Sequence, residues 1–219
     1  MSVAVENFIK AIYLGSKREH SSTRMGSIAK KLCISNAAAT DMAKKLAKRN
    51  LLVYEPYQKL QLTDQGEQLA LGVLRKHRLW ETFLYQFFDM SLHEIHREAE
   101  LLEHQTSDFL ADKLFEYLEC PKFDPHGDPI PTSEGHIIEN TNRFNLAEAD
   151  TDKTYSIAQL QGESKEFFDF CTDHELKKGN MVKVIKAYDT LGMIEIECKN
   201  KNIIITKDFS NQIYVEEKL

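Results

Sequence analysis

The 219-residue sequence contains few cysteines, and no two of them have the close spacing typical of a metal-binding or redox motif. Cys33, Cys120, Cys171 and Cys198 lie far apart, so there is no CxxC pair. This spacing favours neither a disulfide framework nor a zinc ribbon. We therefore expect free thiols.

The sequence also has no long hydrophobic run. No segment approaches the roughly 18 apolar residues of a membrane span, and the first residues lack the apolar core of a signal peptide. We therefore expect a cytoplasmic protein with no membrane partner. A nucleophile elbow, a phosphate-binding loop and an HExxH motif are absent as well, which argues against an enzyme and against a small-molecule substrate.

The charge is distributed unevenly along the chain, although the total is only −6. Residues 1–75 hold 12 Lys/Arg and 6 Asp/Glu, whereas residues 76–219 hold 16 Lys/Arg and 28 Asp/Glu. A basic front indicates a nucleic-acid-binding module, and an acidic rear favours a part that binds cations.

The first 63 residues have the pattern of a winged helix-turn-helix. Helical spacing of apolar residues and a capping Ser35 predict three helices, and two β-prone runs around Pro56 predict a hairpin wing. The predicted helices span residues 3–14, 25–32 and 36–50, and the predicted strands span residues 51–55 and 60–63. The alternative is a helical hairpin with a basic, solvated surface.

In a winged helix the third helix lies in the major groove of DNA, and flanking basic residues meet the phosphates. The residues predicted to face bases or thymine methyl groups are Ser35, Asn36, Ala37, Ala38, Thr40 and Asp41. The residues predicted to contact phosphates are Lys30, Lys44, Lys45 and Lys59. We therefore expect double-stranded DNA as a partner.

Metal-capable side chains share one face of a second helical region. His96, Glu100, Glu103 and His104 are spaced at i, i+4, i+7 and i+8, which aligns them on a helix. Imidazole and carboxylate without thiolate suit Mn²⁺, Fe²⁺, Co²⁺ or Zn²⁺ and favour the harder ions. His77 and Glu81, at i and i+4, form a second candidate pair on a helix predicted for residues 63–88. The alternatives are a solvated charged face and an ordinary ion pair.

Residues 92–119 are long enough for one helix of about seven turns. Its second half carries a broad apolar face formed by Phe109, Leu110, Leu114, Tyr117 and Leu118. This face predicts either a two-fold dimer interface or core packing within one subunit. Residues 120–135 hold four of the five prolines and are predicted to be a connector.

The pattern changes to β from residue 153 onward. The predicted strands are residues 155–160, 181–185, 193–197, 203–206 and 212–215, with a hairpin turn at residues 200–202. A short helix over residues 164–172 places Glu166 near its start. Five short strands in this length predict a small β-barrel.

Three motifs in order, at residues 76–81, 95–104 and 126–131 behind a winged helix, resemble the DtxR/MntR family of metal-dependent transcriptional repressors. The resemblance covers nearly the whole chain and implies a mainly α fold with a β module. The implied parts are a winged helix-turn-helix DNA-binding domain (residues 1–72), a helical metal-binding and dimerisation domain (73–140), a linker (141–152) and an SH3-like, FeoA-like domain (153–219).

The resemblance also implies two metal sites. Site one would be formed by Asn7, Glu100, Glu103 and His104; site two by His77, Glu81 and His96, completed by Glu163 and Glu166; Asp124 and His126 are additional candidates. Glu100 matches the manganese-responsive members, whereas Asn7 and Lys10 replace acidic residues of their two-ion cluster.

We therefore expect Mn²⁺ in preference to Fe²⁺, with Zn²⁺ or Co²⁺ able to substitute, and no two-ion cluster at site one. The implied function is that of a homodimeric repressor that binds operator DNA and controls metal-ion homeostasis. The alternatives are a winged-helix transcription factor that does not respond to metal and, least favoured, a metallohydrolase.

Overall fold

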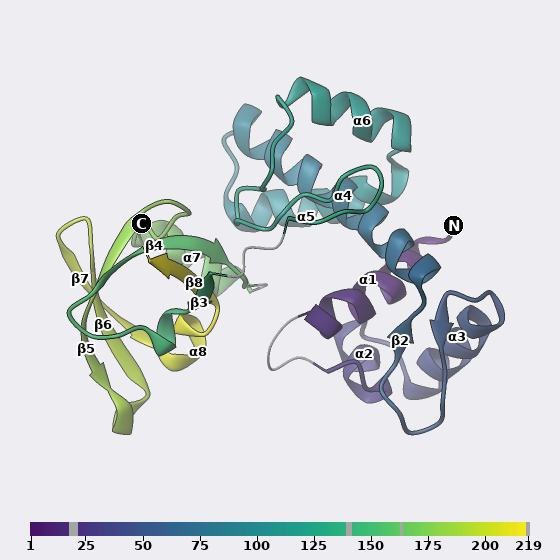
Figure 1. Ribbon diagram of the computed structural model, residues 1–219, viewed down its shortest axis with the longest axis horizontal. Coiled ribbons are helices and arrows are strands. Elements are labelled where there is room, and N and C mark those ends of the chain that lie inside the picture. The colour runs from purple at the N-terminus through teal and green to yellow at the C-terminus, as the bar shows by residue number, and fades with distance from the viewer. Residues whose placement is uncertain (18–21, 139–141, 163, 218–219) are drawn as a thin grey trace. The chain divides into compact units, whose positions relative to one another are not determined.

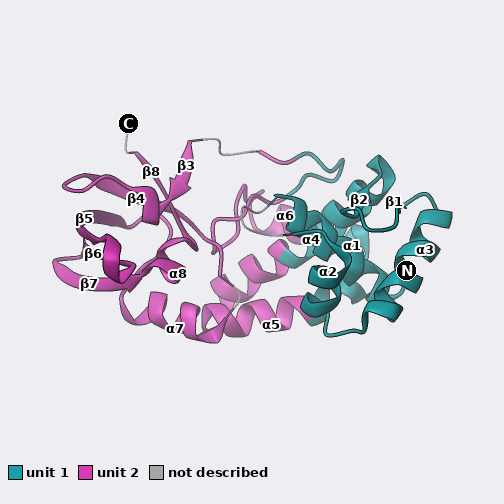
Figure 2. Ribbon diagram, turned by 90° about the horizontal axis from the view of Figure 1, so that it is seen from below, with its two compact units in different colours: residues 1–77, 101–112, 131–136 teal, residues 78–100, 113–130, 137–219 magenta. Residues whose placement is uncertain are grey.

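The computed structural model describes residues 1–17, 22–138, 142–162 and 164–217 (Figure 1). The chain forms two compact units (Figure 2). Unit 1 comprises residues 1–77, 101–112 and 131–136, and unit 2 comprises residues 78–100, 113–130 and 137–219. None of the helices in the described ranges has both the length and the apolar character that a bilayer span requires.

Unit 1 contains the predicted winged helix. Its helices are α1 (Val3–Lys17), α2 (Met25–Lys31) and α3 (Asn36–Lys48). Phe8, Ile9 and Ile12 of α1 are fully buried, as are Ile28 of α2 and Leu46 of α3, so apolar stripes from all three helices supply the core. These bounds confirm the predicted helices to within about three residues.

The wing is a short antiparallel hairpin. Strands β1 (Leu52–Val53) and β2 (Gln61–Leu62) pair directly, and helix α4 (Asp64–Phe87) follows at once. The hydroxyl of Thr63 accepts a hydrogen bond from the Gly66 amide and so caps α4. A side chain at Gly66 would place Cβ 1.9 Å from the Leu51 carbonyl oxygen, which explains the glycine at this close approach.

The prediction of one long helix over residues 92–119 is wrong. The structure has α5 (Leu92–Leu102), a 3-10 turn η1 (Glu103–Gln105) and α6 (Asp108–Tyr117) in its place. Thr106 is extended, its hydroxyl donates to the Leu102 carbonyl, and Ser107 caps the next helix by accepting from the Leu110 amide. Side chains that bond locally to the backbone compete with the helix, and here they end one helix and begin another.

The C-terminal part of unit 2 is a six-stranded antiparallel sheet with the order β3-β8-β4-β5-β6-β7. Its strands are β3 (Arg143–Asn145), β4 (Thr154–Leu160), β5 (Met181–Tyr188), β6 (Met193–Cys198), β7 (Lys201–Thr206) and β8 (Ile213–Glu217). The five predicted strands are therefore confirmed in a mainly helical chain with a β module. Strand β3 was missed, because it lies in the stretch predicted to be the linker.

Short helices and tight turns connect the strands of this sheet. They are η2 (Leu146–Glu148), α7 (Lys165–Asp173), η3 (Asp189–Leu191) and α8 (Lys207–Ser210). Helix α7 confirms the predicted short helix, and the hydroxyl of Ser164 caps it by accepting from the Phe167 amide. The β6–β7 turn was placed slightly too late, because its two central residues are Lys199 and Asn200, both with positive φ.

Candidate functional site

The predicted base-reading surface is the start of helix α3. Ser35 is the N-cap of α3, and its hydroxyl accepts a hydrogen bond from the Ala38 amide. The side chains of Asn36, Ala37 and Ala38 are exposed. Small exposed side chains on the first helical turn leave room for base edges to approach the backbone.

Two residues of the predicted base-reading set already have partners within the helix. The half-buried Thr40 donates its hydroxyl to the Asn36 carbonyl. Asp41 lies 2.7 Å from Lys45 Nζ, and this hydrogen bond lowers the pKa of the Asp41 carboxyl. Both partners of the ion pair are exposed, so either can exchange its partner for DNA at little cost. The predicted phosphate contacts Lys30, Lys44, Lys45 and Lys59 are all exposed.

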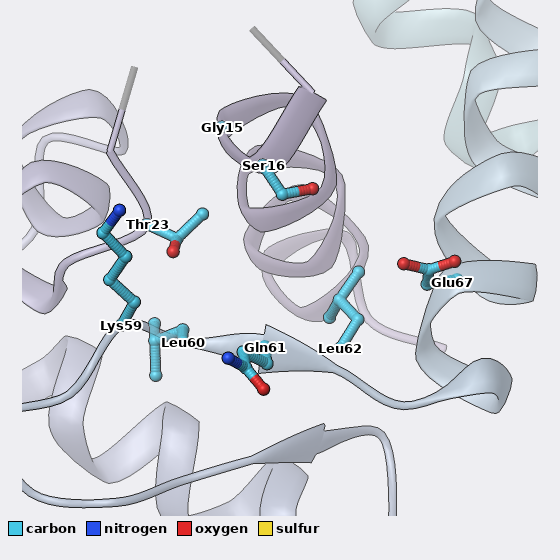
Figure 3. Close-up of a pocket in the computed structure, with 8 residues that line it drawn as sticks. All are labelled: Gly15, Ser16, Thr23, Lys59, Leu60, Gln61, Leu62 and Glu67. Atoms are coloured by element: carbon cyan, nitrogen blue, oxygen red, sulfur yellow. The ribbon is translucent and has the colours of Figure 1, made fainter. Parts of the chain in front are cut away.

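A polar groove of about 550 Å³ lies beside the wing in unit 1 (Figure 3). Its lining comes from the end of α1, strand β2 and the start of α4. Lys59 and Thr23 lie at one end of the groove, and Glu67 lies at the other. Lys59 therefore lies at the edge of this groove, next to strand β2 of the wing.

A buried ionic cluster in unit 1 is centred on Glu103. One carboxylate oxygen of Glu103 lies 2.6 Å from Lys10 Nζ, and the other lies 2.6 Å from His77 Nδ1. The Glu103 side chain is 0% exposed, and the other two side chains are at most 8% exposed. Helices α1 and α4 and the turn η1 thus meet at one carboxylate. His77, predicted for site two, contacts the central carboxylate of site one.

His104 extends this cluster towards α1. Its Nδ1 lies 2.6 Å from Glu6 Oε2, and its Nε2 lies 3.2 Å from Glu103 Oε1 without hydrogen-bond geometry. Asn7 Oδ1 is also buried, and no hydrogen-bond partner for it exists among the described residues. We call Glu6, Asn7, Lys10, His77, Glu103 and His104 the first cluster. Glu6 is not among the predicted ligands, although it lies one helical turn before Lys10.

A second buried cluster lies in unit 2 and is centred on Glu81. Glu81 Oε1 is 2.8 Å from His96 Nδ1 and 3.3 Å from His126 Nε2. The Glu81 side chain is 2% exposed and that of His126 is 5% exposed. Glu100, predicted for site one, lies on α5 in this unit with Oε1 4.0 Å from His96 Nε2. The additional candidate His126 is therefore brought together with two residues of predicted site two.

Asp124 joins the second cluster through a network of polar side chains. Asp124 Oδ2 is 3.9 Å from Arg78 Nε and has no hydrogen-bond partner among the described residues. Asp128 is held by Arg78, 3.2 Å away, and by the side-chain amide of Gln159, 2.8 Å away. We call Glu81, His96, Asp124, His126, Asp128 and Gln159 the second cluster. One histidine of this cluster, His126, and two of its carboxylates, Asp124 and Asp128, lie in the loop that was predicted to be a connector.

Electrostatics in the second cluster follow from its burial. Burial alone lowers the pKa of His126, but Glu81 beside it, with Asp124 and Asp128, outweighs burial and raises the pKa to about 9. Burial, followed by repulsion from Asp128 and Glu81, raises the pKa of Asp124 well above its ordinary range. A cation at this position would relieve both effects, because it would neutralise the crowded carboxylates.

Strand β4 holds the loop that carries His126. The Leu160 amide donates to the His126 carbonyl at 2.7 Å. Gly127 has φ of +93°, and a Cβ there would lie 2.2 Å from the Ala158 carbonyl oxygen, so only glycine fits. The ring of Phe168 on α7 lies 4.9 Å from the His126 ring. The imidazole is therefore positioned by the β module.

Two predicted ligands remain, Glu163 and Glu166. Glu163 lies outside the described residues. Glu166 is exposed in the first turn of α7, two residues before Phe168. The ring of Phe168, two residues after Glu166, contacts the ring of His126, with 4.9 Å between the ring centroids.

Both clusters contain donors that suit a divalent ion. Buried nitrogen and oxygen atoms without hydrogen-bond partners among the described residues are Asn7 Oδ1 and His104 Nε2 in the first cluster, and Asp124 Oδ2, Gln159 Oε1 and both ring nitrogens of His126 in the second. Buried polar atoms normally find partners, so such groups beside carboxylates fit a divalent cation as their partner. Imidazole and carboxylate donors fit Mn²⁺, Fe²⁺, Co²⁺ and Zn²⁺.

Comparison with protein families assigns all three parts of the chain. Residues 1–60 match the iron dependent repressor N-terminal DNA binding domain, and residues 63–132 match the iron dependent repressor metal binding and dimerisation domain. Residues 144–217 match the FeoA domain. An HTH-type transcriptional regulator of Methanocaldococcus jannaschii is 34% identical over 119 residues, which cover 54% of this chain and 95% of the relative. This chain belongs to the DtxR family of iron- and manganese-dependent repressors.

Two further relatives extend over most of this DtxR-family chain. The diphtheria toxin repressor of Corynebacterium diphtheriae is 26% identical over 200 residues, which cover 87% of each chain. The solved structure of a manganese-dependent transcriptional repressor in complex with manganese has a TM-score of 0.91 at 25% identity, and the match covers 98% of this chain and 100% of that one. The resemblance inferred from the motifs is confirmed.

Membership in the DtxR family decides several predictions. The chain is a metal-dependent transcriptional repressor that binds divalent metal and binds operator DNA as a homodimer. It is not an enzyme, so the metallohydrolase alternative fails. The alternative of a transcription factor without a metal response fails as well.

The apolar face predicted for dimerisation divides into two parts. Leu114 and Leu118 are buried, whereas Phe109, Leu110 and Tyr117 are exposed. In unit 2, the ring of Tyr117 lies tilted against the rings of Phe83 and Phe87 of α4, with ring centroids 6.2 and 5.5 Å away. Phe87 and Phe88 are also about half exposed, at 51% and 54%. Leu114 and Leu118 therefore follow the core-packing alternative, whereas the dimer-interface alternative stays a prediction for the exposed Phe109, Leu110 and Tyr117.

Proposed function

We propose that this DtxR-family chain is a manganese-responsive repressor that controls metal uptake, with Fe²⁺ as the second ion it can use. The observation that supports manganese is the chemistry of the donors: both clusters offer imidazole, carboxylate and amide oxygen, and neither contains a thiolate. Among the cysteines of unit 2, Cys171 and Cys198 are buried elsewhere and Cys120 is exposed. Hard oxygen donors favour Mn²⁺ over softer ions.

The first cluster supports a role in fixing the DNA-binding domain. Its residues come from α1, from α4 and from η1, so a single carboxylate connects segments far apart in the chain. A bound divalent ion would supply strong positive charge to the carboxylates. An ion with ligands from separate elements stabilises only the arrangement that brings them together, which is how its differential affinity selects a DNA-competent state.

In this proposal Asn7, Glu103 and His104 hold the first ion. The second ion is held by Glu81 and His96, with Asp124 and His126 as additional ligands. Glu163 and Glu166 remain proposed contributors from the C-terminal domain. The second ion would tie the loop carrying His126 to α4 and α5 in the metal-bound state.

The homodimer would be formed through an aromatic surface of the exposed Phe87, Phe88 and Tyr117, which pack around the half-buried Phe83. A dimer that binds an operator must space its two α3 helices for half-sites about 34 Å apart. Aromatic residues are enriched in protein–protein interfaces, and an exposed aromatic group of this kind commonly marks one. The first turn of α3 would read the bases, while Lys30, Lys44, Lys45 and Lys59 meet phosphates.

The test is a titration of the metal-free protein with Mn²⁺, Fe²⁺, Co²⁺ and Zn²⁺ while binding to DNA from its own upstream region is followed by fluorescence anisotropy. We expect Mn²⁺ to activate binding at the lowest free concentration. Activation by Fe²⁺ at lower concentration than Mn²⁺ would make this an iron-responsive repressor. Phe87→Ala should weaken DNA binding because the dimer is lost. Sedimentation measures the oligomeric state of this variant directly.

A further inference from the structure

The first cluster contains a positive charge of its own. Lys10 is 7% exposed, and its ammonium group lies 2.6 Å from Glu103 Oε1. A buried lysine requires a paired carboxylate, because an isolated charge in the protein interior is strongly disfavoured. The pair therefore joins α1 to η1 by protein groups alone.

The same pair limits what Glu103 can offer to a metal ion. Its second oxygen is already engaged by His77 Nδ1 at 2.6 Å, and its first oxygen faces both Lys10 Nζ and His104 Nε2, which is 3.2 Å away. Asn7, on the same helix as Lys10, has a buried neutral amide oxygen, Oδ1, without a hydrogen-bond partner among the described residues. An ion that binds Glu103 must therefore share the carboxylate with a fixed ammonium group.

We propose that Lys10 acts as a built-in cation of the first cluster, which holds α1 to η1 in the metal-free protein and restricts this cluster to one weakly held divalent ion. The inference rests on the proposed function, because it takes the first cluster to be a metal site. Lys10 would then set the metal concentration at which the DNA-binding domain responds.

Two effects follow from Coulomb's law in a buried site. A fixed positive charge beside the ligands repels an incoming dication, so its removal strengthens metal binding. Removal of Lys10 also leaves Glu103 with one partner fewer in the metal-free protein, which destabilises that state. Opposite changes in metal affinity and metal-free stability are therefore the signature of a built-in cation.

The experiment uses the full-length chain with the second cluster disabled by Glu81→Gln. In this background, Lys10→Met removes the charge while keeping much of the side-chain length. We expect the Kd for Mn²⁺, measured by calorimetry, to fall at least tenfold, and the melting temperature of the metal-free protein to fall. Lys10→Gln, which keeps a donor for Glu103, provides the same test if Lys10→Met does not fold.

A charge-reversing variant examines the stoichiometry. Lys10→Glu in the same background adds a carboxylate to the first cluster, and we expect the number of Mn²⁺ ions bound there to rise from one to two. The matched control is Lys17→Met, which removes an exposed lysine from the same helix and should change neither affinity nor stoichiometry.

Two results separate failure of this inference from failure of the proposed function. If His104→Gln abolishes Mn²⁺ binding but Lys10→Met and Lys10→Gln leave the Kd unchanged or higher, the site stands and the role of Lys10 is wrong. If His104→Gln leaves Mn²⁺ binding unchanged, the first cluster is not a metal site and both ideas fail.

Discussion

The two buried clusters use the same side-chain types but balance their negative charge differently. In the first, Lys10 contacts the central carboxylate of Glu103 at 2.6 Å. In the second, the central carboxylate of Glu81 faces two histidines, and Asp124 has an oxygen without a hydrogen-bond partner among the described residues. Lys10 is therefore a permanent cation on the central carboxylate of the first cluster, whereas in the second cluster the permanent cation, Arg78, lies beside Asp124 and Asp128. A family resemblance alone does not reveal this difference.

The largest expected effect comes from removing the carboxylate of the first cluster. Glu103→Gln leaves Lys10 and His77 buried without their charged partner, and breaking a buried ion pair in this way costs about 3–5 kcal/mol. We expect this loss in the free energy of unfolding of the metal-free protein, measured by urea denaturation. Glu116→Gln, in an exposed pair with Lys113, is the control and should change stability by less than about 1 kcal/mol. An equal effect of both variants would contradict a structural role for the first cluster.

The next effect is a pH dependence confined to the second cluster. The pKa of His126 is raised from 6.5 to about 9, so its contribution to stability is complete below about pH 6.5 and is lost as pH rises through 9. In the presence of a metal chelator, the free energy of unfolding should therefore fall by up to about 3 kcal/mol as the pH rises between these values. His126→Gln should flatten the profile. A profile that is unchanged in this variant would assign the pH dependence to another group.

A comparable effect is expected on metal affinity when the carboxylate of the second cluster is removed. Glu81→Gln keeps the shape of the side chain but removes the charge that faces His96 and His126. We expect Mn²⁺ binding at this cluster to weaken about 100-fold, which corresponds to about 2.7 kcal/mol. Calorimetry with Glu98→Gln on α5 as the control measures the change. Equal affinity in the two variants would exclude Glu81 as a ligand.

The smallest effect concerns a residue behind the second cluster. Gln159→Leu removes the hydrogen bond to Asp128 but keeps the side-chain size. Because Arg78 still holds Asp128, we expect a loss of only about 1 kcal/mol in stability. Weakened orientation of the loop should lower Mn²⁺ affinity about tenfold. A loss of stability without any change in Mn²⁺ affinity would mean that Gln159 supports the fold and not the metal site.

Local chemistry explains which parts of the fold the sequence predicts well. The Ser35 cap and the apolar spacing of α1 act over a few residues, so the helices of the DNA-binding domain are predicted closely. The break after η1 was missed, although Thr106 and Ser107 are residues that compete with a helix. Charge and apolar spacing continue across this break, and periodicity alone does not show where a helix ends.

The sequence predicts which residues belong to the candidate site better than it predicts which of them lie together. Helical spacing indicated that His77 and Glu81 share a face, but which distant carboxylate each one meets depends on packing between segments. His77 therefore contacts Glu103 rather than serving only the predicted second site. Glu6 gave no signal of its own, because a lone glutamate in a first helical turn is explained equally well by the helix dipole.

The hydrogen bond from the Leu160 amide to the His126 carbonyl, together with the close fit of Gly127 against Ala158, decides whether the β module can be separated from the rest of the chain. It makes strand β4 a part of the second cluster's framework, even though β4 itself contributes no proposed ligand. A chain shortened before β4 would lose the support of His126 as well as the C-terminal domain. Removal of the β module would therefore also affect the second cluster. Chimeras that combine this repressor with a relative should take residues 121–131 and strand β4 from the same parent.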